Sequence, residues 1–195
     1  MLAEAGILNS RIKNMARRST QQLVLKPQDL YVLLALLTSA ENGPTYARLA
    51  ERTGLAASAV HASLKRAVLA GLAVIREGRP SILRPQLKEF VLGGAKYAFP
   101  AVLGRVGRGV PTAYAAEPLK SVITPSTDPI PVWAHRNGKA RGVSLAPLYP
   151  TIPEAAPRDA DLYAVLSLFD AYRSGQARER AAAQKLLEKY FGGSA

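Results

Sequence analysis

Residues 45–66 read TYARLAERTGLAASAVHASLKR and predict two short helices joined by a glycine turn. Gly54 supplies the positive backbone φ that such a turn needs, and Ala50 is small enough for the two helices to approach closely. The two helices share an apolar seam made of Leu49, Leu55, Val60 and Leu64. We expect the first helix at 46–53, capped by the Thr45 hydroxyl, and the second at 57–69, with Val68 also facing inward. This spacing is typical of a helix-turn-helix.

The flanking residues extend this pattern on both sides. The apolar runs at 72–76 and 81–84 enclose Glu77-Gly78-Arg79-Pro80, which predicts a β-hairpin with a basic tip. Before the motif, Pro27 and Asp29 suit the first turn of a helix, and residues 30–37 are apolar almost all round, which indicates a buried central helix. A helix-turn-helix followed by a hairpin predicts a winged-helix domain over residues 23–92.

Residues 93–157 differ in composition, since the stretch 100–157 holds ten of the chain's 14 prolines. Long regular helices are not expected there. The many aromatic and branched residues nevertheless indicate an ordered module. Asn137-Gly138, flanked by runs 131–136 and 139–145, predicts a second hairpin. Residues 104–109 (GRVGRG) predict a basic turn.

Helical spacing returns at both ends of the chain. Residues 159–172 and 176–191 predict two antiparallel helices, separated by Ser174-Gly175, in a C-terminal unit of residues 158–195. At the other end, residues 2–18 predict a basic amphipathic helix in a unit of residues 1–22. Its apolar stripe can pack on its own domain or on a second subunit. The expected fold class is α+β, mainly α.

The composition points to a polyanionic partner. The chain has 195 residues, with 26 Lys and Arg against 14 Asp and Glu, and a formal net charge of +12. Such an excess attracts polyanions through counterion release, and nucleic acid is the most common one. The excess is spread along the chain and does not locate a site. No cysteine is present and no apolar run approaches the roughly 18 residues that span a bilayer. We therefore predict a cytoplasmic protein with no membrane contact.

The expected DNA-binding surface centres on the second helix of the motif. An α-helix fits the major groove, and the residues near its amino-terminal end reach the base edges. Ser58 and His61 are the expected base readers, alanine methyl groups can contact thymine, and Arg48, Arg52, Lys65 and Arg66 are expected at phosphates. The complete predicted set is Thr45, Tyr46, Arg48, Ala57, Ser58, His61, Ala62, Lys65, Arg66, Arg76, Arg79 and Ser81.

Catalytic, cofactor and metal chemistry find no support in the residues. The two histidines, His61 and His135, have no cysteine or carboxylate pair at ligand spacing, so we expect no enzyme activity, metal or cofactor. The glycines at 104–109 lack the strand-to-helix context and the Gly-Lys-Ser/Thr of a phosphate-binding loop. Trp133 beside basic residues has two interpretations, a core anchor or a stacking platform for single-stranded RNA.

Over residues 27–92 the sequence resembles winged-helix bacterial transcription regulators of the MarR-like kind. The resemblance rests on the seam residues, Gly54, Gly71, Leu72 and the 76–81 hairpin. It implies a homodimer on a pseudo-palindromic operator, with Ser58, His61 and Lys65 on the recognition surface and Arg79 in the wing. MarR-like proteins run from the wing directly into long dimerisation helices, whereas the proline-rich module intervenes here.

Residues 96–100 and 147–149 are similar to bacterial helix-turn-helix proteins encoded beside a nucleotidyltransferase-like toxin. That resemblance implies an antitoxin-like autorepressor whose residues 93–195 bind a partner protein. The main hypothesis is thus a dimeric, sequence-specific double-stranded DNA-binding regulator, most simply a repressor. The alternative is an antitoxin or adaptor that binds a protein partner.

Overall fold

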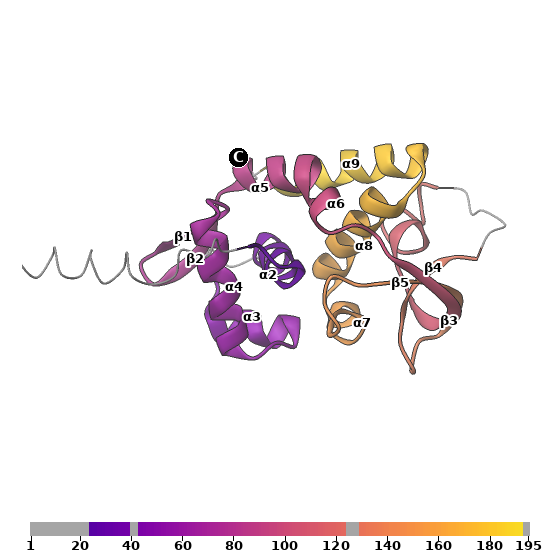
Figure 1. Cartoon of the computed structure of the whole chain (residues 1–195), viewed down its shortest axis with the longest axis horizontal. Coiled ribbons are helices and arrows are strands. Elements are labelled where there is room, and N and C mark those ends of the chain that lie inside the picture. Colours follow the sequence, from indigo (N-terminus) through magenta and orange to yellow (C-terminus); the bar gives the residue numbers. More distant parts are fainter. Residues whose placement is uncertain (1–23, 40–42, 124–128, 193–195) are drawn as a thin grey trace, which may run out of the picture.

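The computed structural model describes residues 24–39, 43–123 and 129–192 and is a mainly helical α+β structure. A helical unit with a two-stranded hairpin lies at one end, and a small three-stranded barrel lies at the other (Figure 1). The predicted helix at 2–18, and with it the unit 1–22, lies outside the described residues. No helix in the described ranges is both long and apolar enough to cross a membrane.

Helix α2 (Pro27–Leu37) is the centre of the fold, and every residue from Leu30 to Leu37 is buried. Helices α3 (Tyr46–Thr53) and α4 (Ala57–Leu69) contact it, and α8 (Ala160–Ser174) contacts it as well (Figure 1). Because it has neighbours from both halves of the chain, it can be apolar almost all round. The prediction of a buried central helix is confirmed.

The turn between α3 and α4 has the predicted geometry. Gly54 lies at φ 65° in the left-handed region and the Thr45 Oγ1 accepts a hydrogen bond from the Arg48 backbone N–H at 3.1 Å. Both helices have the predicted bounds. One expectation was wrong: Val68 was predicted to face inward but is 36% exposed, because α4 ends one residue later and its last turn projects beyond the core.

Strands β1 (Ala73–Arg76) and β2 (Arg79–Ile82) form the predicted antiparallel hairpin, but Arg79 and Pro80, expected between the strands, belong to β2. Glu77 and Gly78 occupy the two-residue turn with φ values of 51° and 76°. Positive φ at both central positions gives the turn a twist that matches the right-handed twist of the flanking strands, as is common in tight hairpins. Arg76 and Arg79 are directly opposite each other at the tip.

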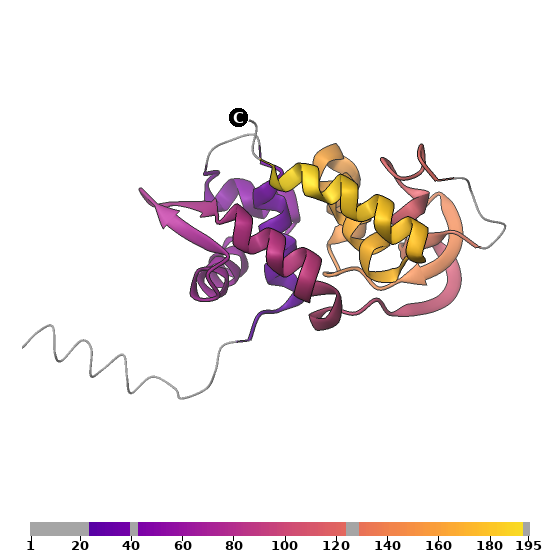
Figure 2. The ribbon, with the colours of Figure 1, turned by 90° about the horizontal axis from the view of Figure 1, so that it is seen from above.

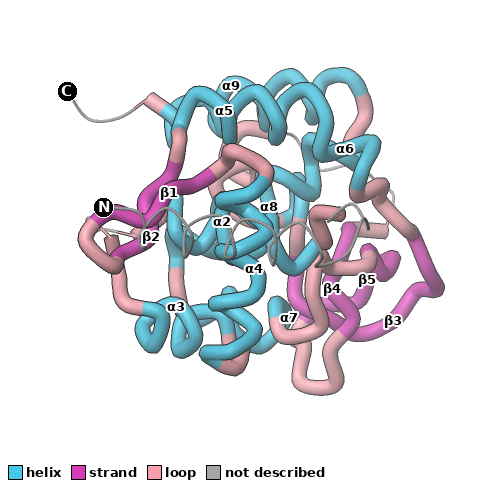
Figure 3. The backbone as a smooth tube through the Cα atoms, turned by 60° about the vertical axis from the view of Figure 1, so that its left-hand side comes forward, coloured by secondary structure: helices cyan, strands magenta, loops and turns pink. Residues whose placement is uncertain are grey.

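A continuous helical stretch leads from this hairpin to the other end of the molecule. It comprises α5 (Arg84–Glu89), a π-helical segment (Phe90–Gly94) and α6 (Ala95–Ala98). The domain boundary predicted between residues 92 and 93 falls inside it. Helix α5 contacts α9 (Ala177–Phe191), the last helix of the described chain (Figure 3). One hydrophobic cluster includes residues of both halves.

The proline-rich segment contains a closed barrel of β3 (Leu103–Pro111), β4 (Pro131–Ala134) and β5 (Ala140–Leu145). Two sequence predictions are wrong here. Residues 104–109 lie in strand β3 rather than in a turn. Residues 131–145 are no hairpin, since β4 and β5 run parallel and each pairs antiparallel with β3. Asn137-Gly138 lies in the connection that passes from one edge of β3 to the other.

Glycines allow the backbones of the barrel strands to approach one another closely. A Cβ on Gly109 would lie 2.2 Å from the Trp133 carbonyl oxygen, and one on Gly138 would lie 2.2 Å from the Gly109 carbonyl carbon. Side chains at these positions are therefore excluded by backbone. Close backbone approach thus explains Gly109 within strand β3, whereas a Cβ on Gly107 would have no described atom outside the adjoining residues within 4 Å.

Helices α8 and α9 form the predicted C-terminal helical hairpin, preceded by α7 (Ile152–Ala155) and two 3-10 turns, Ala113–Ala115 and Ala156–Arg158. Trp133 is buried between the barrel and α8, and its indole N–H donates to the Asp170 Oδ2 at 2.6 Å. Its ring is thus unavailable for base stacking. Of the two interpretations of Trp133, the core anchor is confirmed and the single-strand platform is wrong.

Candidate nucleic-acid interface

Helix α4 presents one solvent-exposed stripe at the end of the molecule that carries the β1–β2 hairpin (Figure 1). Ala57 and Ser58 lie in its first turn, and His61 and Lys65 follow at helical spacing. All four are exposed, and Ala62 beside them is half-buried. The N-cap residue, Ala56, offers no side-chain acceptor to the first-turn N–H groups, so these remain able to bind an anion. The structure thus brings the predicted base-reading residues together on one helix face.

Tyr46 links the start of α3 to this stripe. Its ring lies 5.5 Å from the His61 ring, centroid to centroid, at an interplanar angle of 39°. Aromatic pairs of this kind restrict the orientation of both rings. Thr45, one residue earlier, is exposed and uses its hydroxyl as the α3 cap. His61 is therefore held at the junction of α3 and α4.

The hairpin tip adds cationic side chains. Arg76 and Arg79 are exposed and Ser81 is half-buried. The Arg79 Nη1 donates to the Gly43 carbonyl oxygen at 2.9 Å, which ties the tip to the loop before α3. One of these predicted cations is therefore already partly engaged.

Arg66 does not belong to this surface, contrary to the prediction. Its guanidinium binds the fully buried Asp29 carboxylate in bidentate fashion, through Nε–Oδ2 at 2.7 Å and Nη2–Oδ1 at 2.6 Å. The hydrogen bond to this carboxylate raises the pKa of Arg66. Arg66 is a structural residue that joins α4 to α2.

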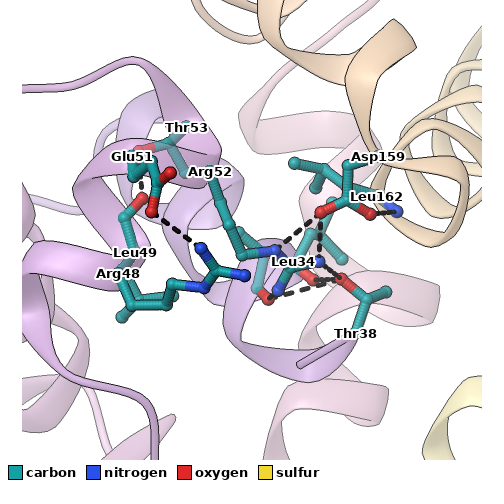
Figure 4. Close-up of polar contacts among 10 residues, drawn as sticks. Leu34, Thr38, Arg48, Leu49, Glu51, Arg52, Thr53, Asp159 and Leu162 are labelled. Atoms are coloured by element: carbon teal, nitrogen blue, oxygen red, sulfur yellow. Dashed lines mark hydrogen bonds and ion pairs between the residues drawn. The ribbon is translucent and has the colours of Figure 1, made fainter. Parts of the chain in front are cut away.

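Arg52 also faces inward instead of toward phosphates (Figure 4). It binds Asp159 with Nε–Oδ2 at 2.7 Å and donates from Nη1 to the Ala35 carbonyl oxygen at 2.6 Å. Arg48 is exposed but pairs with Glu51 at 2.7 Å. Both arginines line a charged cleft of about 430 Å³ between α3 and α7. The two arginines of α3 that were predicted at phosphates thus have carboxylate partners within the chain.

Asp159 in this cleft should make the stability of the fold depend on pH. Burial pushes its pKa up, but hydrogen bonds from Arg52 and from the Leu162 and Asp161 backbone outweigh burial and leave the pKa below its ordinary value. A lowered pKa stabilises the fold above the unfolded-state value of about 3.9 and stops doing so as the pH falls through the folded-state value. Asp159→Asn, which keeps the α8 cap, should destabilise the protein at pH 7. That deficit should shrink below about pH 4 in urea titrations; a deficit independent of pH contradicts the ion-pair account.

An apolar groove of about 260 Å³ beside the stripe was missed by sequence reasoning. Its exposed apolar side chains are Val68, Leu69 and Ile75, and it is also lined by His61 and Lys65. The sequence did contain a signal for this groove, because Leu69 and Ile75 are apolar residues outside the apolar seam of residues 45–66. Apolar side chains at such a position can contact thymine methyl groups.

Known proteins add nothing to these observations. No family model, curated protein or solved structure matches the chain. Across the described residues, no cluster of three or more His, Cys, Asp or Glu side chains is placed to hold a metal ion. The site is thus defined by its geometry and charge.

Proposed function

We propose that this protein is a sequence-specific double-stranded DNA-binding regulator, most simply a repressor, with a winged-helix DNA-binding unit. The observation that carries the proposal is the exposed stripe of Ser58, His61 and Lys65 on α4, flanked by a basic hairpin. The order of α2, α3, α4, β1 and β2 supports a winged helix. The net charge of +12 supports a polyanionic partner.

In this proposal α4 enters the major groove. Ser58 and His61 hydrogen-bond to base edges, while Lys65, Arg76 and Arg79 contact phosphates. The stripe has no Arg, Asn or Gln, the side chains that read bases in bidentate fashion, so we expect modest sequence specificity for each half-site. Two copies related by a two-fold axis would add their half-site contacts on a pseudo-palindromic operator. We assign the protein to the cytoplasm and no catalytic step to it.

Substitutions on this face should separate affinity from specificity. Lys65→Ala and Arg79→Ala should weaken binding to all duplexes, and removal of each phosphate contact should flatten the log–log salt slope by about one unit. Ser58→Ala and His61→Ala should instead change the sequence preference. Fluorescence anisotropy with a duplex from upstream of the gene and a random duplex measures both quantities.

Lys185→Ala on the exposed face of α9 is the matched control, because it removes one lysine far from the stripe. It should leave sequence preference unchanged. Unaltered affinity and preference in all four α4 and hairpin variants would exclude this face as the DNA-binding surface.

A second candidate function is supported by exposed apolar side chains in the other half. Tyr97, Val102, Leu103 and Val106 are 75%, 59%, 63% and 48% exposed. Apolar groups gathered in a short stretch favour a protein partner, as for an antitoxin or adaptor. A stoichiometric partner that co-purifies from the native host with the wild-type chain, but not with Tyr97→Asp or Leu103→Asp, would support it. A partner retained by both variants would contradict this surface.

A further inference from the structure

The barrel carries cations on the outer face of the β3–β5 ladder. Arg108 is directly opposite Arg141, and the adjacent pairs, Gly107 with Gly142 and Gly109 with Ala140, belong to the opposite face. Side chains alternate between the faces of a strand. A Cβ on Gly142 would meet the Ile130 carbonyl oxygen at 1.9 Å and one on Gly109 the Trp133 carbonyl oxygen at 2.2 Å, so at Gly109 and Gly142 this face points into the barrel. Arg108 and Arg141 therefore extend outward together, and both are exposed.

Two like charges in a directly opposite pair repel each other. Their Cβ atoms are about 4.5–5.5 Å apart in such a ladder, and the arrangement is unfavourable without a counter-charge. Neither guanidinium makes a hydrogen bond or ion pair with a described residue, whereas Arg52, Arg66 and Arg173 each bind a carboxylate. An anion bound between them would relieve the repulsion.

Further cations gather at the same end of the barrel. The 135–139 connection lies against β3, since the His135 backbone N–H donates to the Arg108 carbonyl oxygen at 3.1 Å and Gly138 packs on Gly109. The exposed cations of this region form what we call the barrel patch, made of Arg108, Arg136, Lys139 and Arg141. Several neighbouring cations suit a polymer of phosphates better than a single small anion.

We propose that the barrel patch binds the phosphate backbone of a second duplex DNA segment, so that one chain can hold two duplexes; this inference rests on the proposed function of α4. Figures 1 and 2 place the barrel and the β1–β2 hairpin at opposite ends of the described structure, so a short duplex on α4 leaves the patch open. Single-strand binders stack bases on exposed aromatic rings, but the aromatic ring of these strands, Trp133, is buried. Arginine and lysine without a stacking ring match duplex phosphates and carry no sequence information.

The test compares two double variants that remove the same charge. Arg108→Gln/Arg141→Gln removes the opposed pair, and Lys185→Gln/Lys189→Gln removes two exposed cations from α9. With a random duplex of about 30 base pairs, the barrel variant should lower the salt slope by about 1.8 units, since each phosphate contact accounts for about 0.9. The α9 variant should leave the slope within about half a unit of the native value.

A capture assay tests the bridging itself. An immobilised upstream duplex is loaded with protein and then offered a fluorescent random duplex. Native protein and the α9 variant should retain the second duplex, and the barrel variant should retain at least about tenfold less of it while still binding the first. Equal capture by native protein and the barrel variant overturns the proposal, as does preference of the native patch for single strands over duplex.

The two proposals fail in distinguishable ways. Lys65→Ala should weaken loading on the upstream duplex without changing the slope contribution of the barrel pair. If Arg108→Gln/Arg141→Gln changes nothing while Lys65→Ala still weakens duplex binding, the barrel proposal is wrong and the α4 proposal stands. The reverse result overturns the α4 proposal and, with it, the claim that one chain holds two duplexes, while duplex binding by the barrel patch stands.

Discussion

Arg66→Ala should destabilise the fold by about 3–5 kcal/mol, the usual cost of breaking a buried ion pair from one side. Asp29 is fully buried, and among the described residues its carboxylate would keep only the Lys26 backbone N–H, 2.9 Å away, as a partner. An ionised carboxylate left without its cation in that position bears the cost of burial. Urea denaturation at pH 7 measures the destabilisation as a lower midpoint at unchanged slope.

Lys65→Ala is the matched control because Lys65 precedes Arg66 in the same helix and is exposed. Its stability should change by no more than about 0.5 kcal/mol. DNA affinity should instead fall more with Lys65→Ala than with Arg66→Ala, since Lys65 is on the proposed interface and Arg66 is not. Equal destabilisation by the two substitutions would contradict the structural role of Arg66.

Gly142→Ala should destabilise the protein by about 3 kcal/mol or more, at the upper end of overpacking costs. The added Cβ would lie 1.9 Å from the Ile130 carbonyl oxygen, which also accepts the Val143 backbone N–H at 2.9 Å. Relief requires that β4 and β5 separate, and that movement opens the barrel. Thermal unfolding should show a lower Tm.

Gly107→Ala provides the control within the same ladder, because Gly107 is the register partner of Gly142. No described atom outside the adjoining residues lies within 4 Å of a Cβ built at Gly107. Alanine there should be neutral or slightly stabilising, by up to about 1 kcal/mol, because it reduces the entropy of the unfolded state. A large destabilisation at Gly107 and none at Gly142 would contradict the closed barrel.

Local signals were sufficient for the helical unit. The Thr45 cap, the Gly54 turn and the apolar periods act within a few residues, so sequence predicts α3, α4 and the β1–β2 hairpin well. The same local signals do not show which of two adjacent cations of α4 faces solvent and which is buried. Lys65 and Arg66 differ by one position on a helix, and the burial of Arg66 depends on Asp29, 37 residues away.

Long-range pairing explains the errors in the other half. Asn137-Gly138 is a strong local hairpin signal, but both flanking strands find β3, an earlier segment of the chain, as their partner. The glycines of 104–109 suggested a turn because the reason for Gly109, its close approach to the Trp133 backbone, arises only after strands from distant segments meet. Arg52 was likewise assigned to phosphates because Asp159 is 107 residues away.

The most direct test of the central claim is the binding of the native full-length protein to the duplex upstream of its own gene. Anisotropy at physiological salt, with competition by excess random duplex, measures it. We predict a preference of about a thousandfold for the upstream duplex, at the low end of the usual range because direct readout is modest, and reduced by Ser58→Ala or His61→Ala. Equal displacement by random duplex, with no effect of either substitution, would contradict sequence-specific recognition by α4.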